Sequence, residues 1–217
     1  MQIPTLYEDE EIIVCHKPPG LPVQTKSFLQ QDMESLLKSR RIERGEPPYI
    51  GVVHRLDQPV EGVIVFAKTS EAAADLSRQM AAKLTGKYYY AMVQGVPKKK
   101  KELLEDYLLR DGKSNVSSVV SKSTPGAKLA RLSYEVLEAK NGYAILRVCL
   151  MTGRHHQIRV QLSHAGLPIV GDRKYNFQEN MRPCGHDLAL CACKITFRHP
   201  KTHKKLDFEI DNPYTLA

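Results

Sequence analysis

Residues 51–67 read Gly-Val-Val-His-Arg-Leu-Asp-Gln-Pro-Val-Glu-Gly-Val-Ile-Val-Phe-Ala, and the rest of the chain can be ordered around this stretch. Its apolar ends, Gly51–Val53 and Val63–Ala67, have the β-branched composition of strands and flank the polar loop His54–Gly62. Asp57 lies in this loop beside an arginine. A carboxylate held on a loop by a rigid sheet is a candidate nucleophile or general base. The alternative is a surface turn with a local charge pair.

The elements expected around this loop are a few helices and many strands. Capping residues followed by apolar positions at helical spacing predict helices over Asp32–Arg44, Thr69–Leu84 and His156–Ala165. Strands are predicted at Glu11–His16, Tyr88–Val93, Tyr143–Leu150, Asp187–Arg198 and Lys205–Ile210, with several more between residues 107 and 138. Residues 113–128 are the most loop-like stretch. Because turns rather than helices join most strands, we expect an α+β fold with a largely antiparallel sheet, in one domain over residues 1–217.

Composition is that of an ordinary globular protein. Of the 217 residues, 42% are hydrophobic and 26% are charged, which suits a packed core and argues against disorder. No stretch approaches the roughly 18 consecutive apolar residues of a membrane helix. The opening MQIPTLYEDEEII also lacks the basic and apolar regions of a secretory signal. We therefore expect a cytoplasmic protein without membrane association.

The charge of the chain is unevenly distributed. The formal net charge is +8, and much of the excess falls in two blocks. Residues 98–131 carry 9 Lys and Arg against 4 Asp and Glu, and residues 173–205 carry 8 against 2. Such blocks favour a polyanion partner, most simply a nucleic acid. The alternative is a basic surface without a specific partner.

The five cysteines do not form a recognisable disulfide or metal pattern. They are Cys15, Cys149, Cys184, Cys191 and Cys193, an odd number in a chain without a secretory signal. The sequence Pro183-Cys184-Gly185-His186 before the two last cysteines suggests zinc, but the spacing differs from the paired Cys-x2-Cys pattern. His155 and His156 are adjacent at the start of a predicted helix, where neighbouring residues point about 100° apart, so both would rarely bind one ion. We therefore expect reduced thiols and no metal.

Two other segments carry candidate functional side chains. Met151–Arg159 follows a strand and opens a helix, so Arg154 lies near a helix N-terminus. Because a cation gains nothing from that end of the helix dipole, its counter-charge must come from an acidic side chain or a phosphate. In Tyr88-Tyr89-Tyr90 a strand would send the middle ring to one face and its neighbours to the other. A ring facing a basic cleft would stack on a nucleobase, whereas a ring facing inwards would pack in the core.

Taken together, these segments resemble the RluA family of pseudouridine synthases over nearly the whole chain. The matching blocks are Lys17-Pro18-x-Gly20, His54-Arg55-Leu56-Asp57-x4-Gly62, Lys87-x-Tyr89-x-Ala91-x-Val93-x-Gly95, Thr152-Gly153-Arg154-x-His156-Gln157-Ile158-Arg159, Gly166-x-Pro168-Ile169-x-Gly171-Asp172-x2-Tyr175 and Leu190-x-Ala192 with Phe197-x-His199-Pro200. The resemblance implies a central, mainly antiparallel mixed sheet in two halves, flanking helices and a central active-site cleft. The chain would be the catalytic domain without the S4-type domain that many relatives carry.

The resemblance also assigns roles to individual residues. Asp57 matches the catalytic aspartate, Arg154 the arginine that forms an ion pair with it, and Tyr89 the tyrosine that stacks on the extruded base. Arg55 matches an arginine that enters the RNA where the target uridine leaves. Further RNA contacts are expected from His54, Lys87, His156 and Arg159.

The implied reaction exchanges an N–C glycosidic bond of uridine for a C–C bond, without net redox change. No cofactor is needed, which agrees with the lack of a Gly-rich dinucleotide or phosphate-binding pattern. The aspartate either attacks the sugar, as in retaining glycosidases, or removes a sugar proton to give a glycal-like intermediate. Both routes require an ionised Asp57, so we expect an ion pair with Arg154.

Some positions differ from the family pattern and leave the RNA target open. Val60-Glu61 stands where Thr-Ser is usual, and His155 stands where Thr is usual. We expect a monomer acting on structured ribosomal or transfer RNA, gripped through Lys98–Lys101 and Lys201–Lys205 unless these runs are only solvated tips. The alternatives are a catalytically silent RNA-binding module of the same fold and a metal-dependent RNA hydrolase.

Overall fold

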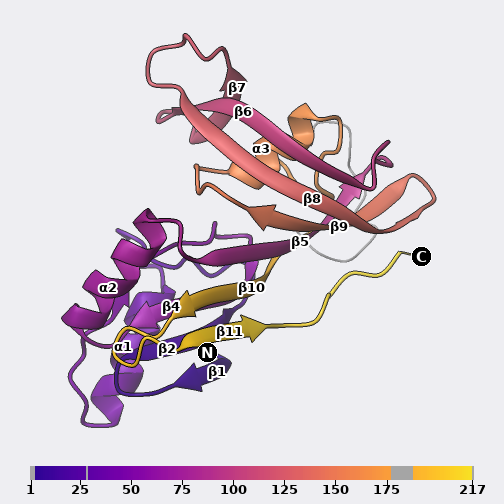
Figure 1. Ribbon diagram of the computed structural model, residues 1–217. Coiled ribbons are helices and arrows are strands. Elements are labelled where there is room, and N and C mark those ends of the chain that lie inside the picture. The colour runs from indigo at the N-terminus through magenta and orange to yellow at the C-terminus, as the bar shows by residue number, and fades with distance from the viewer. Residues whose placement is uncertain (1–2, 28, 177–187, 217) are drawn as a thin grey trace. The chain divides into compact units, whose positions relative to one another are not determined.

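The computed structural model describes residues 3–27, 29–176 and 188–216 (Figure 1). The chain divides into two compact units. Unit 1 comprises Met1–Gly86 and Ala192–Asp211, and unit 2 comprises Lys87–Cys191 and Asn212–Ala217. Each unit is built around antiparallel strand pairs, which confirms the predicted α+β class. The prediction of one domain over residues 1–217 stays a prediction.

The sheet of unit 1 has the strand order β1-β2-β4-β10, with β3 beside β4 and β11 beside β10. Its strands are β1 (Thr5–Glu8), β2 (Ile12–Lys17), β3 (Gly51–Val52), β4 (Glu61–Ala67), β10 (Leu190–Arg198) and β11 (Lys205–Glu209). β4 follows the candidate catalytic loop and is buried on both faces over almost its full length, so it provides the rigid support that the sequence predicts for that loop. β1 was not predicted from the sequence.

Gly62 ends the candidate loop and allows β4 to approach β10. A Cβ atom at this position would lie 2.3 Å from the carbonyl oxygen of Ala192, and its φ of +125° is unfavourable for other residues. The close approach therefore requires glycine. It brings the end of the loop against the backbone of the neighbouring strand.

The described residues of unit 1 include two helices. Helix α1 (Met33–Glu43) begins at the predicted N-cap Asp32, whose side chain accepts from the backbone of Ser35, and Gly45 follows it with φ +71°. Helix α2 (Ser70–Ala81) buries Leu76 in a core cluster with residues of β2, β4 and β10. It ends three residues before the predicted end at Leu84.

The early end of α2 has a local cause. Lys83 adopts a left-handed conformation with φ +56°, and the backbone N–H of Leu84 donates to the carbonyl of Gln79. Leu84 is 69% exposed rather than part of the apolar face. The predicted end was wrong because Lys83, a residue type that rarely takes the left-handed conformation, takes the left-handed position that ends the helix.

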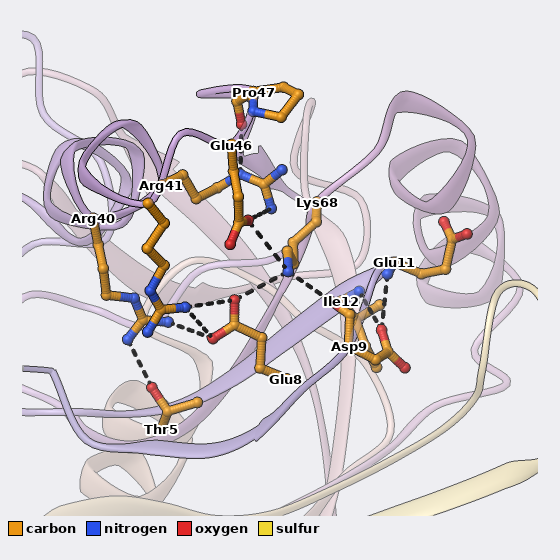
Figure 2. A network of polar contacts seen from close by, with 11 residues as sticks. Thr5, Glu8, Asp9, Glu11, Ile12, Arg40, Arg41, Glu46, Pro47 and Lys68 are labelled. Carbon is orange, nitrogen blue, oxygen red and sulfur yellow. Dashed lines mark hydrogen bonds and ion pairs between the residues drawn. The ribbon is translucent and has the colours of Figure 1, made fainter.

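A partly buried network of charges ties α1 to the strands of unit 1 (Figure 2). Glu8 lies 2.8 Å from Arg40, 3.3 Å from Arg44 and 3.1 Å from Lys68. The Lys68 ammonium also donates to the carbonyl of Asp9 at 2.6 Å. Burial alone would raise the pKa of Glu8, but these cations hold its pKa below the ordinary value.

The sheet of unit 2 has the strand order β5-β9-β8-β6-β7. Its strands are β5 (Gly86–Gln94), β6 (Lys101–Asp111), β7 (Val116–Val120), β8 (Lys128–Lys140) and β9 (Tyr143–Leu150). β7 lies inside the stretch 113–128 that the sequence predicts as a loop. It pairs with β6 from Val116 opposite Asp111 to Val120 opposite Tyr107.

Helix α3 (Gln157–His164) covers part of this sheet. Val160 of the helix packs in a cluster with Leu108, Ala130 and Tyr175. The helix starts one residue later than predicted, because His156 is its N-cap in a left-handed conformation with φ +52°. Within the described residues, no helix is long and apolar enough to cross a bilayer.

Candidate active site

The loop between β3 and β4 is anchored from several directions. Leu56 and Val60 are 7% and 2% exposed, and the backbone N–H of Val60 donates to the carbonyl of Asp57 at 3.0 Å. His54 accepts a hydrogen bond from the backbone N–H of Val65 in β4, at 3.2 Å. Asp57 is half-buried between these anchors. The loop therefore holds the carboxylate at a defined place instead of presenting it on a free surface turn.

His54 and Arg55 differ in what their side chains do. The Nε2 atom of His54 acts as an acceptor for β4, so this ring fixes the loop with its proton on Nδ1. Arg55 is exposed. Of these two expected RNA contacts, Arg55 has the side chain that is open to a partner.

Lys17 lies against this loop, and sequence analysis gave its side chain no role. It is fully buried at the end of β2, and its ammonium donates to the carbonyls of Pro18 at 2.9 Å, Leu21 at 2.6 Å and Gln58 at 2.9 Å. Burial lowers the pKa of Lys17 to about 8, against the opposing effect of the negative charge of Asp57. The available signal was the Lys17-Pro18-x-Gly20 block, which served only as one of the motifs that carry the family resemblance.

The segment that carries Arg154 is organised by Gln157. The Oε1 atom of Gln157 accepts from Thr152 Oγ1 at 2.8 Å and from the backbone N–H of Arg154 at 3.0 Å. Its Nε2 atom donates to the carbonyl of Arg131 at 3.0 Å. The Nε atom of Arg154 donates to the carbonyl of Leu129 at 2.9 Å. The backbone and the guanidinium of Arg154 are thus both held against β8.

The next residues connect this segment to the β6–β7 hairpin. Tyr175 accepts from the backbone N–H of Ser117 at 2.8 Å and shares a hydrogen bond of 2.8 Å with His156 Nδ1. The His155 ring stacks on the His156 ring at 3.7 Å, and its Nε2 atom lies 3.1 Å from Asn115 Oδ1. His156 is 8% exposed. In this structure the two histidines hold the Arg154 segment against the hairpin.

Arg159 forms a buried bidentate pair with Asp172. Its Nε and Nη2 atoms lie 2.8 Å from the two carboxylate oxygens, and the side chains are 6% and 0% exposed. The guanidinium also lies over the Tyr175 ring at 5.2 Å. An RNA phosphate could reach this guanidinium only after the pair opened. The RNA contact expected for Arg159 from the sequence stays a prediction.

The tyrosines of β5 follow the alternation predicted for a strand. Tyr89 is 8% exposed and lies opposite Val148, whereas Tyr88 lies opposite Cys149 and takes the guanidinium of Arg147 over its ring at 5.4 Å. Lys87 precedes them, and burial lowers its pKa. Tyr89 therefore combines the position that the resemblance assigns to a stacking ring with a largely buried environment.

The thiols of the described residues are reduced, and three of them are buried, at Cys15, Cys191 and Cys193. Burial raises the pKa of Cys15 to about 12. The sequence 183–186, which suggested zinc, lies outside the described residues. Within the described parts of the chain, no group of three or more potential ligands could hold a metal ion.

The expected site residues are distributed over both units. Asp57, Arg55 and His54 belong to unit 1, whereas Tyr89 and Arg154 belong to unit 2. The ion pair expected between Asp57 and Arg154 therefore stays a prediction.

Comparison with known proteins identifies relatives over nearly the whole chain. The family model described as RNA pseudouridylate synthase matches residues 11–164. An uncharacterized RNA pseudouridine synthase of Helicobacter pylori is 32% identical over 97% of this chain, and one of Aquifex aeolicus is 34% identical over 97%. A ribosomal large subunit pseudouridine synthase C of Haemophilus influenzae is 32% identical over 94%. The chain spans 66%, 70% and 63% of these three proteins, respectively.

Two solved structures share the fold. The human RNA pseudouridylate synthase domain containing 4 protein superposes with a TM-score of 0.76 at 24% identity, over 97% of this chain and 88% of that one. The human domain containing 1 protein gives a TM-score of 0.80 at 19% identity, over 99% and 85%. At this identity the likeness concerns the fold alone, and it confirms the fold expected from the sequence motifs.

Proposed function

Because this chain belongs to the RNA pseudouridylate synthase family, of the RluA type, we propose that it isomerises specific uridines in RNA to pseudouridine, with Asp57 as the catalytic carboxylate. The observation that carries this proposal is the anchored loop between β3 and β4. The buried side chains of Leu56 and Val60 and the bond from His54 to β4 hold Asp57 half-buried. Asp57 is thus both the residue that matches the family's catalytic aspartate and a carboxylate whose position is fixed by its loop.

The reaction requires a carboxylate that is fixed and ionised. The uracil must leave C1′ of its sugar, turn and reattach through C5, so the nucleotide must be out of the stack and enclosed. Asp57 either forms a bond to the sugar or removes a sugar proton, and both steps start from the anion. Arg154 supplies a cation for that anion in this proposal, and Tyr89 supplies a ring for the base.

The proposed substrate is structured ribosomal RNA, with transfer RNA as the other candidate. The name of the Haemophilus influenzae relative, ribosomal large subunit pseudouridine synthase C, supports the ribosomal choice. The net charge of +8 supports a polyanion partner. Lysines of the two basic runs partly face acidic side chains, as Lys99 does with Glu102 and Lys201 with Glu11. We propose that the protein acts as a monomer in the cytoplasm and contacts RNA mainly through Arg55 and Lys87.

The test is tritium release from RNA labelled at uridine C5, because forming the C–C bond displaces that hydrogen. RNA from cells that lack the gene supplies unmodified sites. We expect stoichiometric release with the purified chain in the presence of a strong chelator, and pseudouridine at the matching position by chemical mapping. Binding of the same RNA without release would instead identify a silent RNA-binding module. Release that stops with the chelator would contradict the metal-free mechanism.

A further inference from the structure

We propose that Asp106 and Gln161 are positioning residues for Arg154, which they hold in place through a chain of hydrogen bonds that runs in one direction. The chain passes through Gln157 and lies entirely within unit 2. The inference rests on the proposed function, in which Arg154 supplies the cation for Asp57. Asp106 and Gln161 would act through Gln157 without touching the RNA.

The face of α3 that carries this chain is polar although it is buried. Gln157 and Gln161 are 3% and 0% exposed, and they lie one turn apart on the same side of the helix. A helix that covers a sheet ordinarily presents apolar side chains at this spacing, because a buried amide costs free energy unless its donors and acceptors are paired. Two apolar side chains would pack here without that requirement, so packing of the core does not by itself account for the two amides.

The acceptors around Gln161 fix the direction in which its amide points. Its Nε2 atom donates to Asp106 Oδ2 at 2.7 Å. The same nitrogen lies 3.4 Å from the carbonyl oxygens of Leu104 and Ala130. Carbonyls and ionised carboxylates only accept hydrogen bonds, so the NH₂ group of Gln161 must face this side. Its Oε1 atom must therefore face Gln157.

Gln157 continues the same direction to Arg154. Its Nε2 atom donates to Gln161 Oε1 at 2.9 Å, so its own Oε1 atom points away from Gln161. That oxygen accepts from Thr152 Oγ1 at 2.8 Å and from the backbone N–H of Arg154 at 3.0 Å. Each bond of the chain thus has its donor on the side of Arg154 and its acceptor on the side of Asp106.

Asp106 is the acceptor at which the chain ends. It lies in β6 opposite Ala130 and is half-buried. Without its carboxylate, the direction of the Gln161 amide would depend on two long contacts of 3.4 Å. If that amide rotated, Gln157 would have to rotate with it and would turn an N–H group toward the Arg154 backbone. The carboxylate of Asp106 therefore contributes a single defined position of Arg154.

A pair of the same two residue types in α2 provides a matched control. The Nε2 atom of Gln79 donates to Asp75 Oδ2 at 2.7 Å, and both ends of the Gln79 amide bind the backbone of Arg198. Gln79 is 7% exposed, and the pair belongs to unit 1. The two pairs thus make similar bonds, but Asp75 and Gln79 lead to an arginine that has no part in the proposed reaction.

The experiment compares Gln161→Met and Asp106→Leu with Gln79→Met and Asp75→Leu in the full chain. The kcat and KM of tritium release are measured, and folding is followed by thermal unfolding. For Gln161→Met and Asp106→Leu we expect kcat to fall about fivefold, with KM changed less than about twofold, because positioning and not RNA binding is lost. Both control variants should have a lower Tm and a kcat within about twofold of wild type.

Two further measurements separate positioning from a general loss of stability. In Asp106→Asn the Oδ1 atom can still accept from Gln161, so we expect a kcat within about twofold of wild type. Gln161→Met is also combined with Gln157→Met. If Gln161 acts through Gln157, the double variant should have the kcat of Gln157→Met within about twofold, since one broken link already releases Arg154. Independent effects would multiply instead.

Three results would overturn the inference. They are a folded Gln161→Met variant with the wild-type kcat, the same loss of kcat in Gln79→Met, and losses that multiply in the double variant. If Gln161→Met does not fold, the comparison at Asp106 decides, because this side chain is only half-buried. A slow Asp106→Leu with a restored rate in Asp106→Asn supports the chain of bonds, whereas equal kcat values in these two variants contradict it.

The failure of this inference can be distinguished from a failure of the proposed function. If the wild-type chain releases no tritium from any RNA, the proposed function fails. If it releases tritium and Asp57→Asn does not, while Gln161→Met behaves like Gln79→Met, only the role of Gln161 and Asp106 fails.

Discussion

The side-chain Oε1 atom of Gln157 accepts a hydrogen bond from the backbone N–H of Arg154 at 3.0 Å. Gln157 is 3% exposed, and its amide also contacts Thr152, Arg131 and Gln161. One buried amide thus determines the path of the chain around the arginine that we assign to the aspartate. The position of Arg154 depends on a residue that need not touch RNA itself.

Replacing Gln157 with Met should therefore lower kcat by more than the loss of stability alone would explain. We expect kcat to fall at least about tenfold and the free energy of unfolding to fall by about 2–3 kcal/mol, because buried backbone partners lose their hydrogen bonds. The control is Gln79→Met in α2, where a buried amide bonds the backbone of Arg198. It should lose similar stability and keep kcat. Equal kcat values for the two variants would argue against a positioning role.

The pair of Arg159 and Asp172 should contribute to stability and not to RNA affinity. Arg159→Met leaves a buried carboxylate without its cation, so we expect a loss of about 3–5 kcal/mol in chemical denaturation. The exposed pair of Arg78 and Asp75 serves as the control, and Arg78→Met should cost less than about 1 kcal/mol. A stable Arg159→Met variant that binds RNA weakly would contradict this prediction and support the RNA contact expected from the sequence.

Glu8 should make the stability of unit 1 depend on acid. Burial opposes its charge, but Lys68, Arg40 and Arg44 lower its pKa below the ordinary value of 4.5. A carboxylate with a lowered folded-state pKa stabilises the protein above its unfolded-state pKa and loses that contribution as pH falls through the folded value. Unfolding measured from pH 6 to pH 3 should therefore show a shallower acid dependence in Glu8→Gln. An unchanged slope would mean that other carboxylates dominate.

Arg154→Lys should behave as a severe change. The guanidinium of Arg154 donates to the Leu129 carbonyl through Nε. Its two Nη atoms can bind a carboxylate at the same time, and a lysine ammonium cannot do both. We expect kcat to fall at least about tenfold with little change in the unfolding temperature. Arg131→Lys, at an exposed arginine paired with Glu105, is the control and should keep kcat. A wild-type rate in Arg154→Lys would remove the predicted ion pair from the mechanism.

Local chemistry made several features predictable from the sequence, and long-range packing decided the others. The N-cap Asp32 and the left-handed Gly45 bound α1 as expected, because both act within one turn of the helix. The predicted end of α2 was wrong because Lys83 takes a left-handed conformation, which a lysine in the sequence does not indicate. β7 was missed because its short Val-Ser-Ser-Val-Val run lies within a polar stretch, where pairing with β6 and the hydrogen bond to Tyr175 stabilise it.

The candidate site shows the same division. The motif around Asp57 could be recognised from the sequence, because the proposed reaction depends on the residue types within it. The buried ammonium of Lys17 binds carbonyls up to 41 positions away in the sequence, and spacing alone does not reveal such contacts. Arg159 was expected to contact RNA because it belongs to the family motif that starts at Thr152. Only the tertiary structure shows that its guanidinium forms an ion pair with Asp172.

The most direct test of the central claim is the rate of tritium release by Asp57→Asn under single-turnover conditions. The substitution keeps the shape of the side chain and removes its negative charge. We predict a loss of at least about 10³-fold in rate, an unchanged unfolding temperature and an RNA affinity within a few-fold of wild type. An Asp57→Asn variant that releases tritium at close to the wild-type rate would contradict the account.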